Sequence, residues 1–335
     1  MYITARTLDD ALYRVLKKLT SNDASAVRAT RGASNEITGI VFKITDPRAR
    51  LSRTAKRGLV FSPLGELIWY LSGSDRLDQI EYYVSRYKKE SEDNLTVYGA
   101  YGPRLFQSEA GQVSKVIDLL KRKQTSRRAV IQLFEGRDLD HEQVPCTCVL
   151  QFLIRSNRLH MFVYMRSNDA YMGLPHDVFA FTMLQELVAR SVGVELGHYK
   201  HMVGSLHLYE ENVSDAVTYL KEAFQERISM PPMPPGDPWD SIRTLVQMEG
   251  KVREGGTIDL SKTGLDRYWQ DLVRLLQIFR IFKNREDMRR VTSLKRAMSS
   301  SVYNVYIDAR TQKVDRKLQD RPIQTPLFVT TNENG

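Results

Sequence analysis

Cysteines and long apolar runs are scarce in this 335-residue sequence. The two cysteines, Cys146 and Cys148, are too few for a disulfide framework, which excludes the small disulfide-bonded secreted proteins. No run of about 18 apolar residues is present, so we expect no membrane span. The first residues lack the apolar core of a secretory signal peptide. We therefore expect a cytoplasmic protein whose cysteines are reduced.

Nucleic-acid-binding motifs are also absent, although the chain is basic. A net charge of +9 favours anionic partners. No zinc finger, RNA-recognition signature or sustained alternation of basic and aromatic residues accompanies this charge. We expect most of it on solvated helix faces and part of it around a small phosphate, and we do not expect nucleic-acid binding as the main role.

The most informative pattern places a cysteine and an arginine at the two ends of a predicted hairpin. Cys146 precedes a β-prone run over residues 149–154, and a second such run over residues 159–165 leads to Arg166. The polar pair Ser156-Asn157 separates the runs, so a hairpin brings Cys146 close to Arg166. A guanidinium favours the thiolate, which is the nucleophilic form of cysteine. The alternative is a buried cysteine with a purely structural role.

Hydrophobic periodicity predicts several further helices and strands. One apolar helix carries Glu66 in its middle, and a buried carboxylate is costly unless it is hydrogen-bonded or functional. Glu66 could alternatively cap the beginning of its helix. The expected helices cover residues 8–19, 63–72, 113–123, 177–192 and 212–226, and the expected strands cover 39–44, 129–134 and 195–203.

A proline-rich segment divides the chain. Residues 230–238 read Met-Pro-Pro-Met-Pro-Pro-Gly-Asp-Pro, the clearest boundary signal in the sequence. We expect a domain over residues 1–230, a linker over 231–238 and a mostly helical extension over 239–335. Within the extension, apolar periodicity predicts helices over 239–248 and 264–282.

Several separated motifs together resemble the thymidylate synthase family of one-carbon transferases, which act on C5 of pyrimidine nucleotides. The motifs follow the family's order and approximate spacing: Pro145-Cys146, Arg166-Ser167, Asp169, Gly173-Leu174-Pro175 and His207-Leu208-Tyr209. The resemblance covers about residues 10–230. It implies an α/β (α+β) fold with a mixed sheet and a long buried helix, and a homodimer. It also implies a pyrimidine nucleoside monophosphate substrate and the cofactor 5,10-methylenetetrahydrofolate, with no metal.

The resemblance assigns catalytic roles to three residues. Cys146 matches the nucleophile that attacks C6 of the pyrimidine. Glu66 matches the glutamate that orders water and assists proton transfer at the base. Tyr98, followed by Gly99, matches a tyrosine near the nucleophile.

Phosphate contacts are implied for five residues. Arg166 and Ser167 match the phosphate site of the subunit itself, while Arg127 and Arg128 match a pair that reaches the nucleotide of the partner subunit. Arg31 matches a phosphate-binding loop arginine, and Arg28 remains open as an alternative for that role. Converging arginines suit a nucleotide phosphate because their contacts are bidentate. The alternative is that these arginines are solvated surface residues.

The implied contacts to the sugar and base involve four residues. His207 and Tyr209 match the pair that holds the sugar 3′-hydroxyl, and Asp169 belongs to the same site. Asp177 stands where the family usually has an asparagine that reads uracil. An ionised aspartate has no donor for uracil O4, but it accepts from the 4-amino group of cytosine. Family members that hydroxymethylate cytidylate carry an aspartate here, although Asp177 could also cap the helix that follows.

These features predict 5-hydroxymethylation of dCMP or CMP through a covalent bond between Cys146 and C6. The alternative is a thymidylate synthase that converts dUMP to dTMP. Three further departures favour the first prediction: Thr147 replaces a usual histidine, Met165 a usual glutamine, and Tyr87 a folate-facing tryptophan. A second alternative is a non-catalytic homologue whose helical extension binds a partner.

Overall fold

A mixed sheet is the centre of the computed structural model, which describes residues 1–21, 24–29, 32–55, 57–107, 111–223 and 225–319. The strands lie in the order β1-β3-β7-β6-β5-β4, with β2 paired to β3. β1 runs parallel to β3 and β6 parallel to β7, while the other pairs are antiparallel. The strands are β1 (Tyr2–Ala5), β2 (Ser25–Ala29), β3 (Gly32–Ile44), β4 (Val130–Gln132), β5 (Thr147–Arg155), β6 (Arg158–Asp169) and β7 (Glu195–Tyr209).

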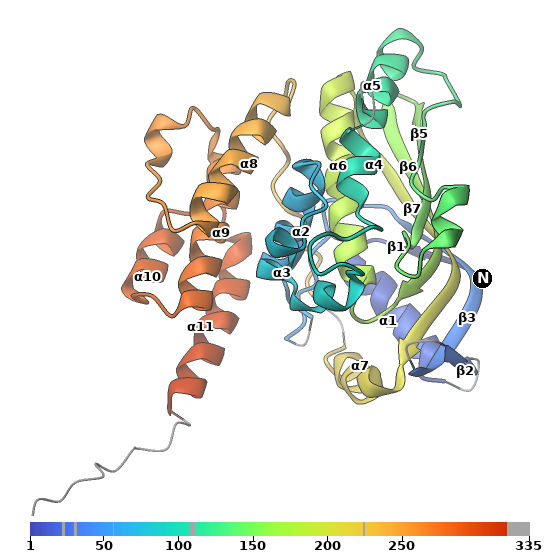
Figure 1. Ribbon diagram of the computed structural model, residues 1–335, viewed down its shortest axis with the longest axis horizontal. Helices are drawn as coiled ribbons and strands as arrows, with labels where there is room; N and C mark the ends of the chain where they lie inside the picture. Colours follow the sequence, from blue (N-terminus) through green and yellow to red (C-terminus); the bar gives the residue numbers. More distant parts are fainter. Residues whose placement is uncertain (22–23, 30–31, 56, 108–110, 224, 320–335) are drawn as a thin grey trace, which may run out of the picture.

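Helices cover one face of this sheet, as Figure 1 shows. Helix α6 lies next to the sheet, α2 packs on α6, and α8 to α11 form the group farthest from the sheet. The helices are α1 (Leu8–Leu19), α2 (Phe61–Leu71), α3 (Leu77–Tyr83), α4 (Tyr101–Phe106), α5 (Gln112–Arg122), α6 (Leu174–Val192), α7 (Val213–Lys221), α8 (Trp239–Arg253), α9 (Arg267–Asn284), α10 (Arg289–Arg296) and α11 (Asn304–Gln319).

The β5–β6 hairpin forms as the sequence predicts. Ser156 and Asn157, the two residues between the strands, both have positive φ, at 48° and 55°. This conformation matches the right-handed twist of a two-residue hairpin. The turn sets the register that places Thr147 opposite Met165, at the far end of both strands.

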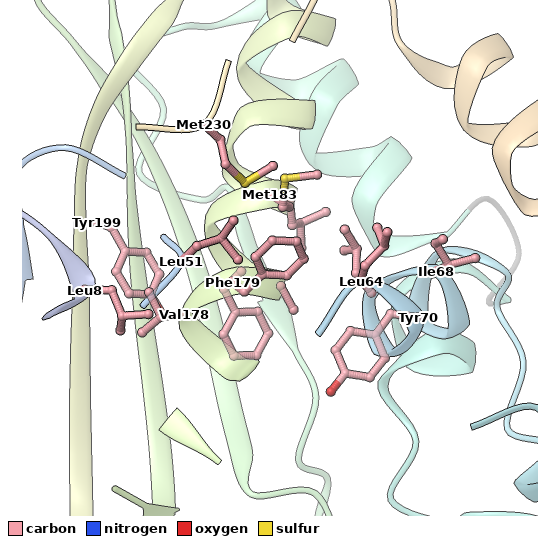
Figure 2. Packing of buried hydrophobic residues seen from close by; sticks show 14 of the residues in the cluster. Leu8, Leu51, Leu64, Ile68, Tyr70, Val178, Phe179, Met183, Tyr199 and Met230 are labelled. Carbon is pink, nitrogen blue, oxygen red and sulfur yellow. The ribbon is translucent and has the colours of Figure 1, made fainter. Parts of the chain in front are cut away.

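Helix α6 is the long buried helix that the resemblance implies. It begins with Pro175 in its first turn and ends at Gly193, which adopts φ of 77°. Figure 2 shows its side chains Val178 and Phe179 packed between Tyr199 of the sheet and Leu64 of α2. Because α6 is apolar on nearly all sides, it packs on the sheet with one side and on α2 with the other, and it thereby sets the distance between them.

The C-terminal extension packs on α2 and α3. Phe279 of α9 lies against Phe61 and Tyr83, with ring centroids 6.0 and 5.1 Å away. The buried Glu249 of α8 accepts a hydrogen bond from the hydroxyl of Tyr83 at 2.9 Å. The ring of Tyr83 lies so close to Gly65 that an added Cβ would come within 2.1 Å of it. The extension therefore supports the part of α2 next to Glu66.

The predicted elements agree well with the observed ones. The helix over 8–19 is confirmed as α1, and the helix over 177–192 begins three residues earlier than predicted. The strand predicted from residue 195 continues to Tyr209, whereas β4 has only three residues. The division of the chain at the proline-rich segment stays a prediction. Among the described residues, no helix is both long and apolar enough to cross a membrane.

Candidate active site

Cys146 and Arg166 meet at the open end of the β5–β6 hairpin. The backbone N–H of Arg166 donates to the carbonyl of Cys146 at 2.9 Å. The guanidinium of Arg166 donates from Nε to the carbonyl of Pro145 at 3.0 Å, and its Nη2 lies 3.9 Å from the Cys146 sulfur. The cysteine is partly exposed and free of any disulfide. This arrangement holds a cation beside an accessible thiol, as a thiolate nucleophile requires.

Cys148 is chemically different from Cys146. Burial raises the pKa of the Cys148 thiol, which disfavours its thiolate form. Arg166 lowers that pKa, but by less than burial raises it. Cys148 is therefore poorly suited to act as a nucleophile.

Two tyrosines flank the segment that contains Cys146. The hydroxyl of Tyr101 accepts hydrogen bonds from the backbone N–H and side-chain hydroxyl of Thr147, at 3.1 and 2.9 Å. The hydroxyl of Tyr98 instead donates to Asp138 at 3.0 Å. Gly99 brings this strip of chain against residues 143–145, where an added Cβ would lie 3.1–3.2 Å from their backbone. Tyr101, which the sequence argument did not single out, is thus hydrogen-bonded directly beside the nucleophile position.

Glu66 is buried and has three side-chain partners. Tyr70 donates to its Oε1 at 3.0 Å, and Tyr87 donates to the same oxygen. Nδ1 of His176 lies 2.5 Å from Oε2. Burial by itself would raise the pKa of Glu66, but the charge and hydrogen bond of His176 and the two tyrosine hydroxyls outweigh it and lower that pKa. Glu66 is therefore an ionised carboxylate inside the protein.

His176 joins α6 to α2. Its Nδ1 contacts Glu66, and its Nε2 lies 3.3 Å from the hydroxyl of Ser62, one helical turn before Glu66 on α2. The family resemblance assigns no role to His176. A histidine at the start of one apolar helix and a glutamate in the middle of another were the sequence signals for this contact.

Asp177 lies one residue further along α6 and is partly buried. Its Oδ2 accepts a hydrogen bond from the side-chain amide of Asn168 at 2.7 Å. Burial and the charge of Glu66 raise the pKa of Asp177 well above its usual value, although the Asn168 hydrogen bond opposes them. This shift favours the protonated carboxyl, which has a hydrogen-bond donor that an ionised aspartate lacks.

The proposed sugar-binding residues lie on neighbouring strands. In the register of β6 and β7, Asp169 is opposite His207 and Ser167 is opposite Ser205. The rings of His207 and Tyr209 have centroids 4.8 Å apart. Oδ1 of Asp169 accepts from the backbone N–H groups of residues 171 and 172, at 2.8 and 3.0 Å. The structure thus brings these residues to the C-terminal ends of β6 and β7, next to the end of the β5–β6 hairpin where Cys146 and Arg166 lie.

The structure describes three of the four remaining arginines that were expected to bind phosphate. Arg31 lies outside the described residues. Arg28 is an exposed residue of β2. Arg127 and Arg128 are exposed and precede β4 at the sheet edge.

The comparisons with known proteins agree with this site. The sequence profile described as thymidylate synthase matches residues 16–233, and the chain belongs to the thymidylate synthase family. One curated relative is the deoxyuridylate hydroxymethyltransferase of Delftia phage PhiW-14, which is 31% identical over 205 residues. The aligned segment covers 56% of this chain and 57% of the relative, so the chain spans about half the length of this relative.

These findings confirm the resemblance that the motifs indicated and the mixed α/β fold that it implied. They also support the prediction of a transferase, since the relative is named as one. The matched region ends within the proline-rich segment, so helices α8 to α11 lie beyond it.

Proposed function

We propose that this protein transfers a one-carbon unit from a folate to C5 of a pyrimidine nucleoside monophosphate and releases a 5-hydroxymethyl product. The observation that carries the proposal is the partly exposed Cys146 thiol beside Arg166. Glu66, ionised inside a polar cluster, supplies the second group that this chemistry needs. The name of the phage relative supports a hydroxymethyl rather than a methyl product.

Each step of the proposed reaction is assigned to particular residues of this chain. The Cys146 thiolate attacks C6 of the base, which makes C5 nucleophilic. When bound, 5,10-methylenetetrahydrofolate supplies the one-carbon unit. Glu66 accepts or returns protons at the base, and Asp177 hydrogen-bonds to its polar edge. Arg166, exposed beside the thiol, stabilises the thiolate and contacts the nucleotide phosphate.

One aromatic side chain beside Glu66 fits a planar folate ring. Tyr87 is edge-on to Trp69, with ring centroids 5.2 Å apart, and its hydroxyl donates to Glu66. Trp69 itself is buried, whereas Tyr87 is partly exposed. The exposed part of the Tyr87 ring offers stacking or edge contacts to a pteridine. We propose Tyr87 as the residue that would contact the folate.

The test is incubation of the protein with methylenetetrahydrofolate and each of dCMP, CMP, dUMP and UMP. Mass spectrometry of the nucleotide distinguishes hydroxymethyl from methyl products. A hydroxymethylated nucleotide that depends on the folate is the expected result. A methylated product accompanied by dihydrofolate would instead identify a thymidylate synthase, and no modified nucleotide would contradict the proposal.

The identity of the base depends on the protonation of Asp177. An ionised carboxylate favours the 4-amino group of cytosine, which was the basis for predicting dCMP. The raised pKa of Asp177 favours the neutral acid, whose O–H can donate to uracil O4 or to cytosine N3. The structure therefore supports deoxyuridylate as a second candidate substrate, and the phage relative is named for that substrate. The prediction of dCMP remains to be tested against it.

We expect the ratio of dUMP to dCMP turnover to fall as pH rises. Asp177 loses its proton as pH passes its raised pKa, and uracil O4 then faces a carboxylate with no donor. One buried polar match is worth about 1–3 kcal/mol, so the ratio should change roughly tenfold to hundredfold. Competition assays with both nucleotides in one tube give the ratio directly, because pH effects on the other groups then cancel.

Asp177→Asn is the matched variant for this measurement. An amide carries a donor at every pH, so the ratio in the variant should favour dUMP and stay flat across the same pH range. A flat ratio in the unmodified protein, or a falling ratio in the variant, would show that Asp177 does not read the base.

We propose that the active form is a homodimer. Arg127 and Arg128 are exposed, and the neighbouring Ala129 accepts a hydrogen bond from Phe152 on β5 at 2.9 Å. Phe152 lies six residues along β5 from Cys146, or about 20 Å at ~3.3 Å per residue. An arginine side chain does not bridge that distance, which supports the proposal that the pair serves the nucleotide of another subunit.

Mixed dimers test this arrangement. Arg127→Ala and Cys146→Ser should each be weakly active alone, because each lacks one component of every site. A mixture of the two after subunit exchange should regain up to about a quarter of unmodified activity, since one site in a mixed dimer is complete. Exchange is followed by native mass spectrometry. A mixture that exchanges subunits without regaining activity, or an active monomer in sedimentation, would contradict the proposal.

A further inference from the structure

His176 and its two partners form a hydroxyl–imidazole–carboxylate series. The ring bridges Ser62 and Glu66, which are one turn apart on α2, with contacts of 3.3 Å at Nε2 and 2.5 Å at Nδ1. The side chain of His176 is 12% exposed and that of Glu66 is 7% exposed. Both partners come from one helix, and the ring comes from the first turn of α6, so the packing of these two helices sets the geometry.

The carboxylate fixes the tautomer of the imidazole. Ionised Glu66 has no proton to donate, so Nδ1 of His176 must carry the hydrogen between them. In the charged ring, whose charge lowers the pKa of Glu66, both nitrogens carry a hydrogen. In the neutral ring, which is the form that can act as a base, Nε2 is an acceptor on the side of Ser62. A carboxylate on one nitrogen stabilises the imidazolium that forms when the other nitrogen takes a proton, which is the arrangement of a general base.

Most hydrogen-bonding positions of Glu66 are occupied. A carboxylate has about four lone-pair positions. Tyr70 and Tyr87 occupy two of them on Oε1, and His176 occupies one on Oε2. One position is left for proton transfer at the base, and the imidazole of His176 offers a separate site that can take a proton from water.

We propose that His176, held by Glu66 and Ser62, is the general base for the water that completes the reaction. This inference rests on the proposed function, because it concerns the last steps of hydroxymethyl formation. Under this proposal His176, on the first turn of α6, determines whether the reaction gives a hydroxymethyl product or another product.

The step is balanced without an oxidant or a reductant. After the folate amine has left, the pyrimidine carries an exocyclic methylene at C5 and the Cys146 sulfur at C6. Water oxygen bonds to the methylene carbon, the π electrons move to form the C4 enolate, and Nε2 of His176 takes the water proton. The enolate then collapses to form the C5–C6 double bond, which expels the Cys146 thiolate. The proton on His176 then returns to solvent.

The variant His176→Asn distinguishes the loss of a proton acceptor for water from the loss of the contact that positions Glu66. The asparagine amide can still donate to Glu66 from near the place of Nδ1, but it cannot accept a proton. We expect hydroxymethyl formation to fall by about 10² to 10⁴, the usual contribution of a general base. Release of tritium from C5 of the nucleotide depends on Cys146 and Glu66, and it should fall by no more than about tenfold.

Added 2-mercaptoethanol provides a second readout. A thiol is partly ionised near neutral pH and needs less help from a base than water does. It should therefore intercept the methylene in His176→Asn and give a 5-thioether nucleotide, which mass spectrometry detects. Ser62→Ala should show the same pattern more weakly, because it removes only the partner of Nε2.

The results of these assays distinguish failure of the inference on His176 from failure of the proposed function. Hydroxymethylation at the unmodified rate in folded His176→Asn would overturn the inference. Equal losses of tritium release and hydroxymethylation would also overturn it, because His176 would then only position Glu66. If the unmodified protein yields no hydroxymethyl product, the proposed function itself fails. Thermal melting confirms that each variant is folded before its rates are compared.

Discussion

Cys146→Ser is expected to reduce turnover by about 10⁴-fold or more while leaving the nucleotide bound and the fold intact. Loss of a catalytic nucleophile has effects on this scale in other enzymes. A serine hydroxyl keeps the size of the thiol but is scarcely ionised near neutral pH, so the Arg166 guanidinium 3.9 Å away has no thiolate to stabilise. Rates are measured by mass spectrometry, nucleotide binding by calorimetry and the fold by circular dichroism.

Cys148→Ser is the control for this variant. Cys148 lies two residues away, and burial raises its pKa, so its thiolate is disfavoured. We expect turnover within a few-fold of the unmodified protein. Near-normal turnover of Cys146→Ser, or an equal loss in both variants, would remove Cys146 as the nucleophile.

Glu186→Ala is expected to give the largest loss of stability. Glu186 of α6 forms an ion pair with Arg50, and the two side chains are 1% and 0% exposed. Its other oxygen accepts from the backbone N–H of Met233 in the proline-rich segment at 2.9 Å. Removing the carboxylate leaves the Arg50 charge buried without its partner, which lowers the free energy of unfolding by about 3–5 kcal/mol. Urea denaturation measures this change.

Two control variants test whether the loss of stability comes from the unpaired buried charge. Asp78→Ala breaks the exposed pair with Arg76, whose side chains are 59% and 70% exposed, and we expect no measurable change in stability. The double variant Arg50→Met with Glu186→Leu removes both buried charges and should recover most of the loss. A loss in Glu186→Ala no larger than that of Asp78→Ala would show that Arg50 finds water or another partner.

The sequence by itself determined the elements that depend on local patterns. Helix α1 has the predicted bounds because its apolar residues repeat with the helical period. Ser156 and Asn157 mark the hairpin turn because both tolerate positive φ. That one turn is enough to bring Cys146 and Arg166 together, since the ends of a hairpin must meet.

Only the tertiary structure decided the chemical state of the site. Glu66 and His176 are 110 residues apart in sequence, and they meet because α2 packs on α6. The residue type alone left the protonation of Asp177 open, whereas burial and the charge of Glu66 raise its pKa and so favour the neutral acid. Residue type sets the ordinary pKa of a side chain, but desolvation and neighbouring charges set its actual pKa, and these arise only when distant segments pack together.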